Sequence, residues 1–118
     1  MHQFLRQTGP ALSPFNAWVM LKSLETMPLR VEKQTANAAA VTEELAGHKK
    51  IRRLIYPGRA DHPQAKIIKK QMEAGSNLIA FELDADKAAT FRFLNALKLI
   101  GISNNLGDAK SLITHPST

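Results

Sequence analysis

Residues 51–58 read Ile-Arg-Arg-Leu-Ile-Tyr-Pro-Gly, a short and mostly apolar run that ends at a Pro-Gly pair. Such a run predicts a β-strand from Ile51 to Tyr56 that leads into a turn. Residues 78–83 read Leu-Ile-Ala-Phe-Glu-Leu, and their alternation places Ile79, Phe81 and Leu83 on one face. These two stretches therefore predict the strands of a small sheet.

A helix is predicted between the two strands. It opens at Pro63, directs Ile67, Ile68 and Met72 inward and its lysines outward, and ends at Gly75. A second helix is predicted after the second strand, beginning at Asp86 and ending at Gly101. Its apolar positions are Ala89, Phe93, Leu97 and Ile100. A short extended piece, residues 102–106, then leads into Gly107 and a final turn before residues 115–116.

Two further helices are predicted before the first strand. Ser13 is a good N-cap, and Pro14 at the first helical position loses no hydrogen bond because its missing N–H would be unpaired there. The apolar positions of this helix are Phe15, Trp18, Val19 and residues 21–24, and Pro28 is expected to end it. The next helix carries Val31, Ala38, Val41 and Leu45 on one face and ends at Gly47.

The predicted order of elements is α, α, β, α, β, α, β, which indicates an α/β domain with helices packed on a small sheet. Two or three short strands make a thin sheet for a domain of this size. We therefore expect that at least one strand is missing and that the domain is incomplete at its C-terminal end.

Composition is typical of a globular domain, with 118 residues of which 44% are hydrophobic and 22% charged. No long apolar run and no cysteine occur, so a membrane span and disulfides are not expected and a cytoplasmic location is permitted. The net charge of +6 gathers at residues 49–53 and 66–70. Tyr56 is the aromatic residue near these clusters, so solvated surface is preferred to a nucleic-acid-binding patch.

Common catalytic signatures are absent from the sequence, including phosphate-binding glycine loops, nucleophile elbows and metal-ligand spacings. The four histidines are far apart in sequence, and each is expected to be solvated or to cap a turn: His2, His48, His62 and His115. Asp84 and Asp86 are explained by a helix N-terminus. Trp18 is expected to be a core residue.

Three blocks resemble stretches of the Cys/Met-metabolism (trans-sulfuration) family of pyridoxal-phosphate enzymes. Residues 8–26 resemble its TGP-x-x-SPFNAW-x-x-LK-x-LET stretch, and residues 56–72 resemble YPG-x-x-x-HPQ followed by QM. Residues 105–116 resemble SLG-x-x-x-SLI-x-HP, with Asn105 in place of the usual first serine. The blocks have the family's order and separations and span nearly all of the chain.

The resemblance implies a part of a fold-type-I enzyme that is tetrameric when whole. Residues 1–28 would be the linking segment and helix after the cofactor domain, and residues 29–118 the small C-terminal domain. The sequence of residues 105–112, Asn-Leu-Gly-Asp-Ala-Lys-Ser-Leu, is most similar to that of the homoserine-ester sulfhydrylases. The block at residues 8–26 favours the O-succinyl over the O-acetyl ester as substrate. The implied reaction converts O-succinylhomoserine and sulfide to homocysteine and succinate.

The resemblance also implies where the site residues lie. Asn105 would contact the carboxylate of the substrate, Asn104 would face its γ-region and influence replacement against elimination, and Leu106 would contribute its backbone. The Schiff-base lysine and phosphate-binding residues would lie before Met1, so no catalytic, cofactor or metal residue is expected here. Lys110 lacks the surrounding motif of the Schiff-base lysine.

Two other classes of function remain open. A truncated relative could work without cofactor as an interaction or structural module. A basic nucleic-acid-binding domain would rest on charge alone. The visible absorbance of bound pyridoxal phosphate distinguishes the enzyme from an interaction module. Salt-dependent binding of nucleic acid would support a nucleic-acid-binding domain.

Overall fold

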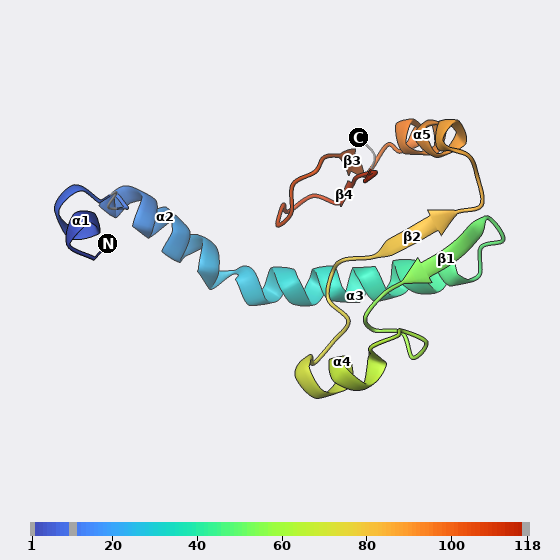
Figure 1. The fold of residues 1–118 in the computed structure, drawn as a ribbon, viewed down its shortest axis with the longest axis horizontal. Coiled ribbons are helices and arrows are strands. Elements are labelled where there is room, and N and C mark those ends of the chain that lie inside the picture. The colour runs from blue at the N-terminus through green and yellow to red at the C-terminus, as the bar shows by residue number, and fades with distance from the viewer. Residues whose placement is uncertain (1, 10–11, 117–118) are drawn as a thin grey trace.

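The computed structural model describes residues 2–9 and 12–116, arranged as Figure 1 shows. The elements follow in the order α1 (His2–Thr8), α2 (Pro14–Glu25), α3 (Met27–Ala46), β1 (Ile51–Ile55), α4 (Ala65–Gln71), β2 (Ala80–Leu83), α5 (Lys87–Ala96), β3 (Gly101–Ile102) and β4 (Leu112–Ile113). Helices pack with two short sheets, so the predicted α/β class is confirmed.

The first long helix begins as predicted and ends earlier than predicted. The Ser13 side-chain oxygen accepts a hydrogen bond from the Asn16 backbone N–H at 3.2 Å, and Pro14 occupies the first turn of α2. The prediction that Pro28 ends this helix is wrong, because α2 ends at Glu25 and Pro28 lies in the first turn of α3. A proline is tolerated there because the N–H that it lacks would have no helical partner. The expected boundary at residues 28/29 therefore falls inside α3.

The main sheet pairs β1 with β2 in antiparallel register, and α3 lies along it in Figure 1. The pairing is irregular between Ile51 and Arg53, as expected where one strand carries an extra residue. The Glu82 carboxylate forms ion pairs with the guanidinium groups of Arg52, at 2.8 Å, and Arg53, at 3.6 Å. One of the two basic clusters is therefore partly neutralised by the neighbouring strand.

The core is small and centres on α3 and the strands. Ala38 and Thr42 of α3, Tyr56 after β1 and Leu94 of α5 are buried. The rings of Phe81 and Phe93 meet edge to face, 6.3 Å apart, and attach α5 to β2. These contacts attach α5 to the sheet that α3 lies along.

Four details of the predicted elements differ from the structure. Ile67 and Met72 were expected inside but are 53% and 40% exposed. Of the extended piece expected at residues 102–106, Ile102 lies in a strand, as the second residue of β3. The final turn contains the strand β4, which pairs in parallel with β3. The helix predicted up to Gly101 ends at Ala96.

Helix α2 meets α3 at its C-terminal end, where the Arg30 guanidinium donates to the Ser23 carbonyl at 2.8 Å, and Figure 1 shows α2 with α1 on an arm that points away from the strands. None of its residues is buried, and Trp18 is 56% exposed, so the expectation of a core tryptophan is wrong. Its large exposed apolar side chains are Phe15, Trp18, Val19, Met20, Leu21 and Leu24. These positions surround the helix rather than forming one stripe, which is typical of a helix covered on several sides. No helix in the described ranges is long and apolar enough to cross a membrane.

We predict that the chain on its own associates through α2. Exposed apolar surface of this extent drives association, so sedimentation equilibrium should give a weight-average mass that rises with concentration. Replacing Trp18 and Leu21 by serine should reduce that rise. A concentration-independent monomer that binds no hydrophobic dye would contradict the prediction.

Candidate functional site

The segment that carries the predicted substrate residues is the loop between β3 and β4. Asn104, Asn105 and Leu106 are all exposed there, Leu106 to 83%. The Asn105 backbone N–H donates to the Ser103 hydroxyl at 3.3 Å. Gly107 has a φ of +84°, a left-handed conformation that favours glycine and turns the chain after Leu106. The three residues therefore form one exposed projection.

The base of this loop is fixed by backbone pairing on both sides. The Gly101 N–H donates to the Ser111 carbonyl at 3.0 Å, and the Ser103 N–H donates to the Ile113 carbonyl at 3.1 Å. Farther along the loop, the Lys110 N–H donates to the Asp108 carboxylate at 2.9 Å. The loop is therefore a braced turn and not an unstructured connection.

A side chain of α3 contacts the far part of the loop. The Gln34 Nε2 donates to the Asp108 carbonyl at 3.4 Å, across 74 residues of sequence. The Oε1 of the same amide accepts a hydrogen bond from the Asn77 Nδ2 at 2.8 Å. Gln34 thus joins the loop to the segment that precedes β2.

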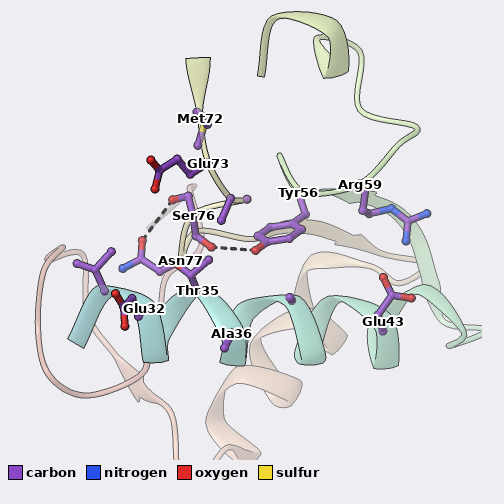
Figure 2. Close-up of a pocket in the computed structure, with 15 residues that line it drawn as sticks. Glu32, Thr35, Ala36, Glu43, Tyr56, Arg59, Met72, Glu73, Ser76 and Asn77 are labelled. Atoms are coloured by element: carbon purple, nitrogen blue, oxygen red, sulfur yellow. Dashed lines mark hydrogen bonds between the residues drawn. The ribbon is translucent and has the colours of Figure 1, made fainter. Parts of the chain in front are cut away.

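A groove of about 780 Å³ lies between α3 and the segment 72–77. Figure 2 shows the Tyr56 ring lying over α3, with its hydroxyl directed at Ser76. The Tyr56 hydroxyl donates to the Ser76 carbonyl at 2.9 Å, and the side chain is only 3% exposed. Burial raises the pKa of this phenol above its ordinary value. Tyr56 therefore remains neutral and able to donate this hydrogen bond at physiological pH.

Two glycines, Gly58 and Gly75, leave the space that the Tyr56 ring occupies. A Cβ added at Gly75 would lie 2.6 Å from the Gly58 nitrogen and 2.6 Å from Cζ of Tyr56. A Cβ added at Gly58 would lie 2.6 Å from Cε1 of the same ring. The backbones at Gly58 and Gly75 therefore lie against each other and against the Tyr56 ring, and a side chain at either position would collide with them.

The charges of the groove do not fit a phosphorylated cofactor. Three carboxylates line it, those of Glu32, Glu43 and Glu73. The lining cation Arg59 is engaged by Asp61 at 2.8 Å, and its hydrogen bonds lower the pKa of that carboxyl. A phosphate group needs cations and N–H donors. Lys110 is exposed and does not line this groove.

Two of the histidines cap turns as predicted, whereas the half-buried His115 lies against an aromatic ring. The ring nitrogens of His48 and His62 accept hydrogen bonds from the backbone N–H two residues ahead, of Lys50 at 3.2 Å and Gln64 at 3.1 Å. The His115 ring lies 5.2 Å from that of Phe91. The His2 side chain lies outside what the structure describes. Nowhere in residues 2–9 and 12–116 do three metal-ligand side chains gather.

The sequence indicated the loop residues but not those that hold the loop. Asn104, Asn105 and Leu106 fall together on one turn, whereas Gln34 and Asn77 carried no signal. A glutamine on a helix face and an asparagine before a strand are common surface residues. Their role depends on partners 43 and 74 residues away, which no local pattern reveals.

The whole described fold has the features of one part of a larger pyridoxal-phosphate enzyme. Residues 1–118 match the family described as Cys/Met metabolism PLP-dependent enzyme, and the chain belongs to that family. It is 47% identical over 122 residues to the O-succinylhomoserine sulfhydrylase of Mycobacterium tuberculosis, covering 100% of this chain and 30% of that protein. It is 40% identical to the O-succinylhomoserine sulfhydrylase of Pseudomonas aeruginosa, over 98% of this chain and 28% of that protein.

Solved structures confirm the fold. The chain superposes on the O-acetylhomoserine sulfhydrylase of Wolinella succinogenes with a TM-score of 0.86 and 36% identity, over 94% of this chain and 32% of that one. It superposes on the cystathionine gamma synthase of Xanthomonas oryzae pv. oryzae with a TM-score of 0.87 and 33% identity, over 93% and 28%. The chain therefore spans about 30% of the length of the relatives that it matches, and its fold is that of part of a fold-type-I enzyme.

We predict that Gly75→Ala destabilises the chain. The added methyl would meet backbone and a packed ring at 2.6 Å, and overpacking of this kind costs about 1–3 kcal/mol. Gly47→Ala is the matched control, because its nearest neighbour would be 3.9 Å away and its φ is −82°. Urea unfolding of both variants is the measurement, and equal midpoints would contradict the packing described here.

Proposed function

We propose that this chain is the substrate-binding part of a pyridoxal-phosphate-dependent homoserine-ester sulfhydrylase, in methionine biosynthesis. The observation that carries the proposal is the exposed projection of Asn104, Asn105 and Leu106, in a loop that hydrogen bonds hold in place. The sequence of this loop resembles that of the sulfhydrylases. The 47% identity to an O-succinylhomoserine sulfhydrylase supports the succinyl ester as substrate and sulfide as the second reactant. Homocysteine and succinate would be the products.

In this proposal the cofactor belongs to residues outside the chain. Pyridoxal phosphate, when bound, supplies an electron sink for the chemistry at the substrate. The acidic groove beside α3 does not fit its phosphate, so we assign no residue of this chain to it. Residues 1–28 would link to the cofactor domain and residues 29–118 would form the small domain of a cytoplasmic homo-oligomer. The exposed apolar surface of α2 is consistent with cover by that domain.

Each loop residue has a proposed task at the substrate. The Asn105 amide donates a hydrogen bond to the substrate carboxylate, and the Leu106 backbone lies beside it. Asn104 faces the γ-substituent and influences whether replacement or elimination follows. Because Gly107 turns the chain directly afterwards, the projection is short and its donors remain close together.

An interaction module that works without cofactor is the alternative, and the uncovered α2 is the observation that favours it. The two proposals differ in the visible spectrum of the complete protein. Bound pyridoxal phosphate absorbs visible light, whereas a module without cofactor does not.

We predict that Asn105→Ala lowers kcat/KM for the homoserine ester by about ten- to a hundredfold in the complete enzyme. A hydrogen bond to a charged group contributes about 1.5–3 kcal/mol, which corresponds to that range. Serine should recover much of the loss, and aspartate should be worse than alanine because it repels the substrate carboxylate. Asn95→Ala, an exposed asparagine on α5, is the control and should leave the kinetics unchanged.

Variants of Asn105 should behave differently if this residue does not contact the substrate. A residue that only shapes the turn would give variants with reduced stability but unchanged kinetics per active site. An aspartate variant as active as the wild type, with equal cofactor content, would remove Asn105 from the substrate site.

A further inference from the structure

Three side-chain hydrogen bonds form a continuous line from the groove wall to the substrate loop. The Ser76 hydroxyl donates to the Asn77 Oδ1 at 3.4 Å, and the Asn77 Nδ2 donates to the Gln34 Oε1 at 2.8 Å. The Gln34 Nε2 then donates to the Asp108 carbonyl at 3.4 Å. Ser76 itself is held through its carbonyl by the Tyr56 hydroxyl at 2.9 Å.

The loop end of this line determines the orientation of both amides, because the Asp108 carbonyl can only accept a hydrogen bond. A carboxamide has its acceptor and its donors on opposite ends. The Nε2 of Gln34 therefore faces the loop and its Oε1 faces Asn77, which donates its Nδ2 to that oxygen. This bond from Asn77 and the half-buried position of Gln34 on α3 hold the amide in that orientation.

The contact point on the loop is close to the proposed substrate residues. Asp108 follows Asn105 by three positions, with Gly107 between them at a φ of +84°. The backbone pairing of β3 and β4 fixes the base of the loop at residues 101–103 and 111–113. Gln34 adds a third point, near the tip, that comes from a different element.

We propose that Gln34 is a positioning residue for substrate binding: it holds the Asp108 carbonyl and thereby sets the position of the Asn104–Leu106 projection. This inference rests on the proposed function of the loop. Gln34 does not touch the substrate and acts through the backbone of residues 105–108. Asn77 supports it by fixing the orientation of its amide.

The first test uses the complete enzyme and three variants. Gln34→Met removes both hydrogen bonds at similar volume, and Gln34→Glu keeps the acceptor for Asn77 but places a carboxylate against the Asp108 carbonyl. Both should raise KM for the homoserine ester about three- to tenfold with kcat nearly unchanged, because the carboxylate contact is present before and during the reaction. Asn77→Ala, which leaves the donor of Gln34 in place, should have a smaller effect in the same direction.

Two comparisons separate positioning from a general loss of stability. Gln71→Met, at an exposed position at the end of α4, should leave KM at the wild-type value. In an Asn105→Ala background, Gln34→Met should add little, because residues that act through one contact are not additive. A purely structural role would instead lower the amount of active enzyme and leave KM unchanged by Gln34→Met in both backgrounds.

A second test does not depend on the reaction. Amide hydrogen exchange of the 118-residue chain should become faster at residues 104–110 in Gln34→Met, while exchange in α3 and β1 stays at the wild-type rate. If the wild-type enzyme does not convert a homoserine ester, the proposed function fails and this measurement still decides whether Gln34 positions the loop. Unchanged exchange at residues 104–110, or wild-type KM in both Gln34 variants, would overturn the proposal.

Discussion

The contact of the Tyr56 ring with Gly58 and Gly75 is the interaction on which the rest of the structure depends. Tyr56 stands at the end of β1, and its hydroxyl holds the Ser76 carbonyl, so it connects the first strand to the segment that leads into the second. Few other side chains in the described core are as deeply buried. The ring fits only because both glycines lack a side chain. A small core of this kind depends strongly on each close contact.

The position of the β3–β4 loop follows from that contact in a series of steps. Ser76 and Asn77 are held beside α3, Asn77 orients Gln34, and Gln34 reaches the loop. The opposite end of the chain has no such support, because the apolar residues of α2 find no cover within the described residues. The chain therefore contains a braced loop and an uncovered arm, and it spans about 30% of the length of the family members that it matches.

Local patterns predicted the elements well, and failed where the outcome depends on distant partners. Ser13, Gly47 and Asp86 act through neighbours within a few residues, and all three cap their helices as expected. Proline stereochemistry is compatible with either the end or the first turn of a helix, so Pro28 was misplaced. Trp18 was assigned to a core that the described residues do not supply. The link through Gln34 could not be predicted, because it joins side chains that only the folded chain brings together.

The proton NMR spectrum of the 118-residue chain tests the Tyr56 contact most directly. This packing predicts nuclear Overhauser contacts from the Tyr56 ring protons to the α-protons of Gly58 and Gly75. It also predicts ring-current shifts of those α-protons, which Tyr56→Leu should abolish. Random-coil shifts at both glycines, without such contacts in a folded chain, would contradict the central role of Tyr56.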